Sequence, residues 1–184
     1  MAKARRKWRR QQGGFDPARL IFLDESRAKT NMTRWCGRAP RGQRVHDQAP
    51  HGHWHATTLI GAPSSACMTL EGAPDTDVFR AYVAEVLCPR LQPGGVVIMD
   101  NLSPHKSPAT LALIEKCGAQ TLFLPAYSPD LNPIEKMWSK VKTSLRAAKA
   151  RTSEHLIEAI AMALAQITPQ DAMNWFASCG YSLI

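Results

Sequence analysis

Residues 96–106 read VVIMDNLSPHK, and the four apolar residues that end at Asp100 decide the fold class. The same pattern occurs in LIFLD at residues 20–24, and TLFL at residues 121–124 is stopped by Pro125. Short unbroken apolar runs bounded by charged or turn residues are typical of strands that are buried on both faces. The sequence therefore predicts three buried strands at the centre of an α/β fold.

The segments around these strands predict the other elements of the fold. Apolar stretches at residues 54–61 and 66–72 flank the turn sequence APSS and predict a β-hairpin. Apolar residues at helical spacing, with Pro at several first helical positions, predict helices at about residues 78–87, 108–117, 133–145, 153–167 and from 168 onward. Because the hairpin supplies antiparallel strands and the crossovers supply parallel ones, we predict a mixed sheet flanked by helices.

Asp24 and Asp100 are each the first charged residue after four apolar ones, at the carboxyl end of a predicted strand. Ligands bind at that edge of open α/β sheets, and a buried aspartate there is costly unless a positive group lies beside it. A strand-end aspartate also commonly caps the next turn, as in DNLS at residues 100–103. Two such aspartates on strands that can be neighbours suggest a shared cation.

Glu135 is the candidate third carboxylate. Asn132 fits a helix N-cap and Pro133 a first helical position, which puts Glu135 at the third helical position. A glutamate there can satisfy backbone donors in a capping box, or it can reach the strand ends from the first turn of the helix. Both interpretations stay open. We place Trp138 in the core, because the helix has an apolar face made of Ile134, Met137, Trp138, Val141 and Leu145.

Charge and chemistry point to one kind of substrate. Three carboxylates suit Mg²⁺ or Mn²⁺, which prefer oxygen ligands, and two such ions about 4 Å apart can clamp both reacting oxygens of a phosphodiester. The 184 residues carry a formal net charge of +8, and residues 1–48 hold 13 Lys/Arg against four acidic residues. Such a block usually binds nucleic acid, although it also occurs as a solubilising tail. The residues predict metal-dependent phosphoryl transfer on a nucleic acid.

Composition excludes several other classes of protein. A hydrophobic share of 45% and a charged share of 21% are ordinary for a globular protein and exclude a mainly disordered chain. No run reaches the roughly 18 apolar residues of a membrane span, and the N-terminus lacks the apolar stretch of a secretory signal. We therefore expect no membrane partner. Five scattered cysteines without a C-x-x-C pair favour reduced thiols in the cytoplasm.

Three stretches carry a resemblance to a known family: IFLDES (21–26), VVIMDNLSPHK (96–106) and LPAYSPDLNPIEKMWSKVK (124–142). With 34 residues between Asp100 and Glu135, the sequence resembles the DDE transposases of the mariner superfamily, in the bacterial insertion-sequence branch. The resemblance covers roughly residues 18–165. WCGRAPRGQR at residues 35–44 is similar to the basic segment that follows the first strand in that family.

The resemblance implies a ribonuclease H-like fold, with a central mixed β-sheet flanked by α-helices. It implies that Asp24, Asp100 and Glu135 are the catalytic residues and ligate two Mg²⁺ or Mn²⁺ ions, with Asp24 bridging both. It places three further residues around these ligands: Asn101, His105 and Asn132. His105 would orient a phosphate or a ligand carboxylate, or it is merely solvated in its Ser-Pro-rich turn.

The implied reaction has two metal-assisted steps on DNA. Water first attacks a phosphodiester at the transposon end, and the freed 3′-hydroxyl then attacks target DNA, typically at a TA dinucleotide. The chain's predicted DNA-binding residues are Arg5, Arg6, Lys7, Arg9, Arg10, Arg38, Arg41, Arg44, Lys106 and Lys142. We interpret the alternating histidines of HGHWH at residues 51–55 as a polar strand start or a DNA-facing loop, in preference to a transition-metal site.

The predicted organisation has three parts. Residues 1–17 are expected to form a basic arm or linker that is flexible until an anion orders it, with Trp8 either stacking on a partner or docked on the domain. Residues 18–150 are expected to form the ribonuclease H-like DDE catalytic domain. Residues 151–184 are expected to form C-terminal helices packed on the core.

The short arm determines which partners we expect. Family members usually carry N-terminal helix-turn-helix modules that read the transposon ends, and residues 1–17 have no room for them. The expected partners are the terminal inverted repeats, a TA target, a second copy in a homodimer and an upstream helix-turn-helix frame of the same element. We expect action in the bacterial cytoplasm, on chromosomal or plasmid DNA. The alternatives are a truncated, non-catalytic DNA-binding or assembly remnant and a general nuclease of the same fold.

Overall fold

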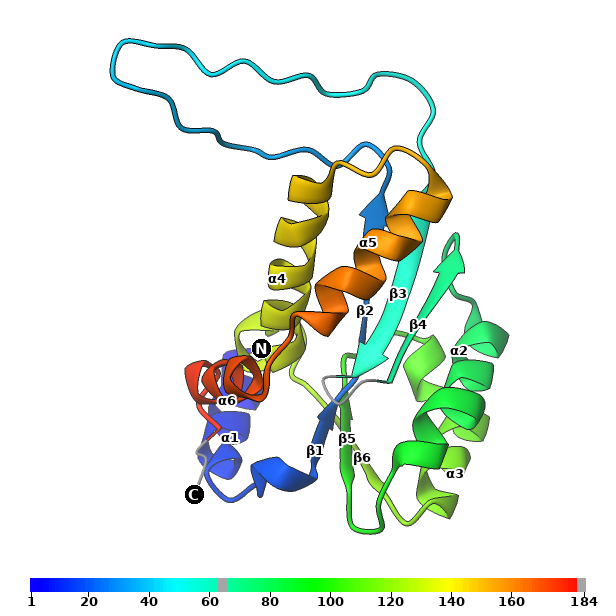
Figure 1. Cartoon of the computed structure of the whole chain (residues 1–184). Coiled ribbons are helices and arrows are strands. Elements are labelled where there is room, and N and C mark those ends of the chain that lie inside the picture. The colour runs from blue at the N-terminus through cyan, green and yellow to red at the C-terminus, as the bar shows by residue number, and fades with distance from the viewer. Residues whose placement is uncertain (63–65, 182–184) are drawn as a thin grey trace.

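The computed structural model describes residues 1–62 and 66–181, and its strands form two three-stranded ladders (Figure 1). The strands are β1 (Leu20–Phe22), β2 (Asp24–Lys29), β3 (Ala56–Ala62), β4 (Ala66–Glu71), β5 (Val96–Met99) and β6 (Gln120–Phe123). The order β1-β5-β6 is parallel and the order β2-β3-β4 is antiparallel. The backbone N–H of Leu23 donates to the carbonyl of Ile98 at 2.9 Å, so the chain passes from one ladder directly into the other. The predicted α/β fold with both parallel and antiparallel strands is confirmed, and the strands are divided between two ladders in place of one mixed sheet.

Helices lie on both sides of the strands, with α4, α5, α6 and α1 on one side and α2 and α3 on the other (Figure 1). The helices are α1 (Ala2–Gln12), α2 (Thr76–Tyr82), α3 (Pro108–Lys116), α4 (Pro133–Ala148), α5 (Ser153–Ala165) and α6 (Pro169–Ser178). The short helical turns are η1 (Pro17–Arg19), η2 (Val83–Leu87), η3 (Cys88–Arg90), η4 (Pro104–Lys106) and η5 (Pro129–Leu131). None of the described helices has the length and apolar character needed to cross a membrane.

Alternate residues of the central strands enter two separate hydrophobic cores. Phe22 and Ile98 pack in the core that includes residues of α4, α5 and α6, whereas Leu23, Val97 and Met99 pack in the core that includes residues of α2 and α3. All five side chains are at most 1% exposed. Burial on both faces explains why these strands are unbroken apolar runs in the sequence.

Helix α4 begins at Pro133, as the sequence predicts, and its predicted apolar face is buried. Trp138 is 2% exposed, so its placement in the core is confirmed. The ring packs over Gly61 of β3, where an added Cβ would lie 3.0 Å from Cη2 of Trp138. The missing side chain at this position lets α4 pack closely against the strand that pairs with β2.

Residues 2–12 form helix α1, which corrects the expectation of a flexible arm. Trp8 is 7% exposed, and its Nε1–H donates to the hydroxyl of Tyr181 at 3.1 Å. Gln12 is also buried and donates to the carbonyl of Cys179 at 2.5 Å. The net positive charge of residues 2–12 favours a solvated segment. Burial of the Trp8 indole, with its N–H hydrogen-bonded, orders the segment as a helix instead. Of the two alternatives for Trp8, docking on the domain is the one observed.

A long loop connects β2 and β3 and projects away from the strands (Figure 1). The segment after α4 holds the first residues of this loop in place, because Arg151 donates to the carbonyls of Thr30 and Met32, each at 2.9 Å. Lys149 pairs with Asp47 in the loop at 2.6 Å. The exposed residues of the loop include Arg38, Arg41, Arg44, His51, His53 and His55. Among the described residues, no group of metal-binding side chains includes these histidines.

Residues 63–65 of the predicted hairpin turn and residues 182–184 of the predicted C-terminal segment lie outside the described residues. Strands β3 and β4 pair antiparallel on either side of that turn, as predicted. Helices α5 and α6 enter the same core as α4 through residues such as Leu156, Ile160 and Phe176. The boundaries between the three predicted parts of the chain stay predictions.

Candidate active site

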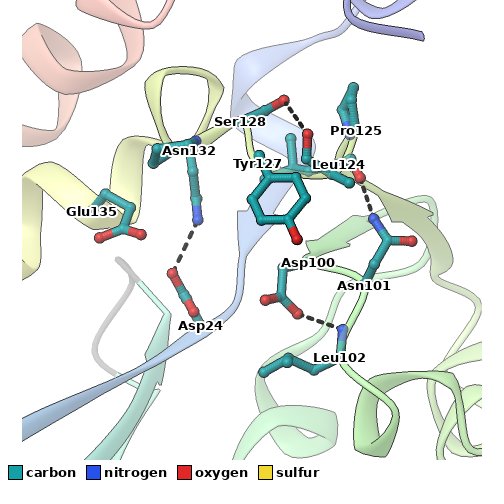
Figure 2. A pocket seen from close by; sticks show the side chains of 12 residues that line it. Asp24, Asp100, Asn101, Leu102, Leu124, Pro125, Tyr127, Ser128, Asn132 and Glu135 are labelled. Atoms are coloured by element: carbon teal, nitrogen blue, oxygen red, sulfur yellow. Dashed lines mark hydrogen bonds between the residues drawn. The ribbon is translucent and has the colours of Figure 1, made fainter. Parts of the chain in front are cut away.

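Asp24, Asp100 and Glu135 line one cavity of about 470 Å³ (Figure 2). Asp24 is the first residue of β2, Asp100 directly follows β5, and Glu135 lies in the first turn of α4. The three side chains meet because β1 and β5 are parallel neighbours that end at the same edge, where α4 also begins. This is the edge at which α/β sheets bind ligands.

Asp24 is the most deeply buried of the three carboxylates, at 9% exposure. One oxygen, Oδ1, accepts from the backbone N–H of Glu25 at 2.8 Å, and Oδ2 accepts from Nδ2 of Asn132 at 3.1 Å. Burial, and then the negative charges of Glu135, Glu25 and Asp100, raise the pKa of Asp24 to about 7, against the lowering effect of the Glu25 N–H. The hydrogen bonds to Asp24 therefore come from uncharged donors, whereas the charged groups around it are other carboxylates.

Asn132 occupies the N-cap position of α4, but its side chain makes no capping hydrogen bond. Its amide points to Asp24 instead, and its Oδ1 is buried without a hydrogen-bond partner. The backbone N–H of Asn132 donates to the carbonyl of Pro129 at 3.1 Å, so it is not engaged in a capping box with Glu135. Glu135 is exposed and faces the cavity (Figure 2). The structure thus favours the second interpretation of Glu135, in which it faces the strand ends.

Asp100 accepts one hydrogen bond and lies at ion-pair distance from a histidine. Its Oδ1 accepts from the backbone N–H of Leu102 at 2.9 Å, so the turn-capping interpretation of this residue also holds. Nδ1 of His105 lies 2.7 Å from the same oxygen. Burial acts to raise the pKa of Asp100, but the hydrogen bonds and the positive charges of His105 and Lys106 outweigh it and leave the pKa below its ordinary value.

His105 is completely buried in η4, which excludes the solvated alternative. Its ring lies 4.4 Å from the ring of Phe79, centroid to centroid, and its Nε2 lies 2.9 Å from Oε1 of Glu25. Burial acts to lower the pKa of His105, but its bonds to Asp100 and Glu25 raise the pKa to about 9. The imidazole therefore lies between the two carboxylates, hydrogen-bonded to Glu25 and at ion-pair distance from Asp100.

Glu25 is a functional candidate that the sequence analysis missed. It follows Asp24 on β2, so strand alternation directs its side chain to the opposite face, toward His105. Its Oε2 is buried without a hydrogen-bond partner. The sequence shows an acidic residue beside Asp24, but the pairing with a histidine 80 positions away is visible only in the folded chain.

The donor set suits a hard divalent cation. Among the described residues, no three side chains of His, Cys, Asp or Glu lie close enough together to hold a metal ion. The three carboxylates nevertheless line one cavity, and their repulsion contributes to the raised pKa of Asp24. A cation would relieve that repulsion, and the unpaired Oδ1 of Asn132 offers a further oxygen.

The remaining predicted residues occupy three different places. Asn101 lines the cavity and donates to the carbonyl of Leu124 at 2.5 Å. Arg5 and Arg9 on α1 both pair with Asp130, whereas Arg6, Lys7 and Arg10 are exposed on the same helix. Lys106 is exposed and Lys142 is partly buried; both lie outside the residues that line the cavity. The predicted DNA-binding residues therefore come from α1, η4, α4 and the loop between β2 and β3.

The sheet order and the likeness to solved structures define the class of fold as α/β and ribonuclease H-like. Residues 19–157 match the family described as DDE superfamily endonuclease, and the chain belongs to this family.

Similar proteins are transposases of the mariner type. The chain is 28% identical over 167 residues to the transposable element Tcb1 transposase of Caenorhabditis briggsae, covering 80% of this chain and 60% of that protein. A Mos1 transposase paired-end complex with the left transposon end has a TM-score of 0.69 at 14% identity, covering 95% of this chain and 55% of that chain. The Mos1 catalytic domain with raltegravir and Mn has a TM-score of 0.58 at 14% identity, covering 100% and 92%. The chain thus spans little more than half of the two longer proteins.

We predict that Asp24→Asn stabilises the metal-free protein at pH 8. Because the pKa of Asp24 is raised from 3.8 to about 7 on folding, the folded protein binds this proton more tightly than the unfolded chain does. Stability therefore falls as the pH rises from about 4 to about 7 and stays reduced above that range. Removing the carboxylate should gain on the order of 2–4 kcal/mol at pH 8 and much less at pH 5.

Urea unfolding with a chelator present, at both pH values, measures this difference. Asp77→Asn, at an exposed aspartate on α2, is the matched control and should keep the pH dependence of the unsubstituted protein. An equal gain from Asp24→Asn at pH 5 and pH 8 would show that the folded-state carboxylate is not raised in pKa.

Proposed function

We propose that this chain is the catalytic domain of a transposase from the bacterial insertion-sequence branch of the mariner superfamily. It cleaves DNA at transposon ends and joins the freed ends to target DNA. The observation that carries the proposal is that Asp24, Asp100 and Glu135 line one cavity in a member of the DDE superfamily endonucleases. The similarity to the Tcb1 transposase supports it.

In this proposal, Asp24, Asp100 and Glu135 hold two Mg²⁺ or Mn²⁺ ions. Bound there, the ions would supply Lewis-acid activation of the attacking water or 3′-hydroxyl and would stabilise the charge on the leaving oxygen. Structures of the Mos1 catalytic domain with Mn and with Mg support this choice of metal.

The chain itself contributes orientation. Asn132 holds Oδ2 of Asp24 by a hydrogen bond of 3.1 Å, so that this carboxylate keeps one direction in the cavity. On the opposite face, Glu25 is hydrogen-bonded to His105, and His105 lies at ion-pair distance from Asp100. Ligands fixed by such supporting contacts are pre-organised for the reaction, and positioning supplies a large share of the rate in phosphoryl transfer.

The proposed DNA surface includes the outer face of α1. Lys3, Arg6, Lys7 and Arg10 follow helical spacing on this face, opposite the face that carries Trp8, and they line one shallow surface depression. These side chains, with Arg38, Arg41 and Arg44 of the long loop and with Lys106 and Lys142, would contact phosphates. The Mos1 complex with a transposon end supports DNA as the partner. Arg5 and Arg9 have a different task, because both pair with Asp130.

The longer relatives guide the proposal on partners. We propose that helix-turn-helix modules, encoded in an upstream frame of the same element, supply recognition of the terminal inverted repeats. The catalytic domain would act as a homodimer on two ends and insert them at TA dinucleotides. Its place of action would be the bacterial cytoplasm, on chromosomal or plasmid DNA.

Asp100→Ala should abolish metal-dependent cleavage of DNA that carries the element's terminal inverted repeats. Loss of a supporting residue around a metal typically costs about 10–100-fold, so loss of a ligand should cost at least about 100-fold. A nicking assay in Mn²⁺ measures the rate. Glu158→Ala, at an exposed carboxylate on α5, is the control.

Three other outcomes of this assay each have a clear meaning. Undiminished cleavage by Asp100→Ala contradicts the proposed site. Equal cleavage of end DNA and random duplex by the unsubstituted protein favours a general nuclease. No cleavage by that protein, even with the upstream modules added, favours the non-catalytic remnant.

Replacing Arg6, Lys7 and Arg10 together by Gln should weaken DNA binding and its dependence on salt. Each lost phosphate contact lowers the slope of log affinity against log salt by about 0.9, so the slope should fall by roughly 2–3. Fluorescence anisotropy with duplex DNA at several salt concentrations measures it. Substitution of Arg80, Arg90 and Lys116 on the α2–α3 side removes the same charge and should leave the slope nearly unchanged. Equal losses in both variants would indicate a general charge effect.

A further inference from the structure

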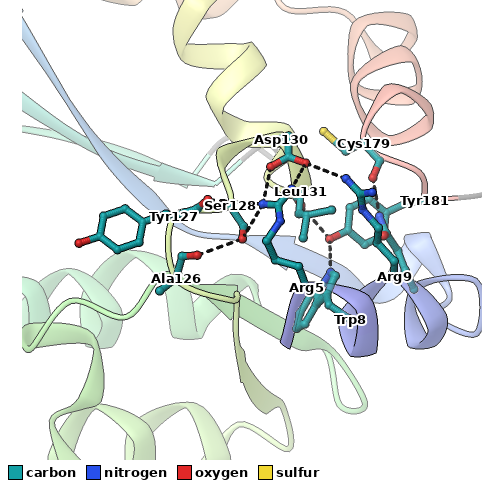
Figure 3. Close-up of polar contacts among 11 residues, drawn as sticks. Arg5, Trp8, Arg9, Ala126, Tyr127, Ser128, Asp130, Leu131, Cys179 and Tyr181 are labelled. Carbon is teal, nitrogen blue, oxygen red and sulfur yellow. Dashed lines mark hydrogen bonds and ion pairs between the residues drawn. The ribbon is translucent and has the colours of Figure 1, made fainter. Parts of the chain in front are cut away.

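Helix α1 contacts the loop of residues 125–132 through one fork of hydrogen bonds (Figure 3). The Arg5 guanidinium donates to both carboxylate oxygens of Asp130, at 2.8 and 2.7 Å, and to Oγ of Ser128 at 2.9 Å. Nη1 of Arg5 also lies 3.4 Å from the carbonyl oxygen of Tyr127. A single planar side chain therefore engages three residues of the loop, in the bidentate geometry that gives Arg–carboxylate pairs their directional specificity.

A second, buried route connects the same helix to the same loop. The Trp8 Nε1–H donates to the Tyr181 hydroxyl at 3.1 Å, and that hydroxyl donates to the carbonyl of Leu131 at 2.8 Å. Arg9 adds an ion pair to Asp130 at 3.1 Å. Helix α1 is thus attached to residues 127–131 by contacts on both the surface and the interior.

This loop forms one wall of the acidic cavity. Pro125, Tyr127, Ser128 and Asn132 line the cavity, and the chain then enters α4 and reaches Glu135. The position of the loop therefore determines where Asn132 meets Asp24 and where Glu135 begins its helical turn.

The backbone conformation of Tyr127 indicates that contacts with the rest of the protein impose the conformation of this loop. It has a φ of 54°, in the left-handed region that non-glycine residues rarely adopt, and its side chain is 85% exposed at the cavity. Such a conformation costs free energy and persists where the surroundings impose it, often at functional sites. The contact from Arg5 to the Tyr127 carbonyl is one such constraint.

The Arg5–Asp130 ion pair differs from an ordinary surface ion pair because it fixes a loop that lines the cavity. The side chains of Arg5 and Asp130 are 28% and 47% exposed, and pairs at that exposure add little to global stability. Their effect is therefore local, on the loop that carries Tyr127 and leads to Glu135.

We propose that Arg5 of α1 and Asp130 are positioning residues of the active site: together they hold residues 125–132 in the conformation that sets Glu135 and presents the Tyr127 ring to DNA in the cavity. The inference rests on the proposed function of that cavity. Since the outer face of α1 is the proposed phosphate-binding face, one helix both contacts DNA and supports the catalytic wall.

The test combines single and double variants. Arg5→Ala and Asp130→Ala should each lower the cleavage rate at saturating DNA by about 10-fold, since misplacement of about 1 Å can cost up to 100-fold. The double variant should be no slower than either single variant, because the two residues act through each other. Arg5→Lys keeps the charge but loses the fork, so it should recover only part of the rate. Arg80→Ala breaks a comparable Arg–Asp pair on α2 and should keep the full rate.

Hydrogen exchange gives a readout that does not need activity. The backbone N–H groups of Leu131 and Asn132 donate to the carbonyls of Ser128 and Pro129, at 3.1 Å each. Peptides covering residues 125–132 should exchange faster in Arg5→Ala and Asp130→Ala than in the unsubstituted protein or in Arg80→Ala.

Unchanged exchange in both variants would overturn the inference, whatever the activity. Faster exchange with an undiminished rate at saturating DNA would also overturn it, because the loop would then be held without serving catalysis. If the unsubstituted protein cleaves no DNA, the proposed function fails, and the inference as stated fails with it; the exchange result still shows separately whether Arg5 holds the loop.

Discussion

The repulsion among acidic side chains around Asp24 is the constraint on which the rest of the site depends. Four carboxylates lie near one edge of the sheet, and burial together with Glu135, Glu25 and Asp100 raises the pKa of Asp24 to about 7. The fold tolerates this arrangement because polar groups contact the carboxylates. Asp24 accepts from the Asn132 amide and a backbone N–H, and Asp100 accepts from a backbone N–H and lies beside the His105 imidazole. Such a site is costly for stability, and its negative charge suits a bound divalent cation.

The sheet creates this arrangement by a change of strand partner. The chain pairs with β5 up to Leu23 and then with β3 from Asp24, at the place where β5 ends in Asp100. Asp24 therefore faces the start of α4, while Glu25 faces the α2–α3 side and reaches His105. The two faces of one strand are thus connected to two different carboxylates that line the same cavity, Asp24 on one face and, through His105, Asp100 on the other.

The sequence predicted those features that depend on local pattern. Apolar runs ending in Asp24 and Asp100 predicted the strands, and the Asn132-Pro133 pair predicted the start of α4, because burial and backbone geometry leave direct traces in residue order. Helix α1 was missed because its charge suggested a flexible arm, although Trp8 and Gln12 already stood at helical spacing with Arg5 and Arg9. The roles of Glu25 and Asp130 depend on partners about 80 and 125 residues away, at His105 and Arg5, and no local pattern contains such pairs.

The most direct test of the account is a titration of the protein with Mn²⁺, followed by thermal unfolding and by calorimetry. If the acidic cavity binds the metal, saturating Mn²⁺ stabilises the unsubstituted protein, by about 2.7 kcal/mol at 100 times the dissociation constant. Asp24→Asn and Asp100→Asn should lose most of that gain, whereas Asp77→Asn should retain it. Equal stabilisation of all four proteins, or no heat of binding to the unsubstituted protein, would contradict the assignment of Asp24, Asp100 and Glu135 as a metal site.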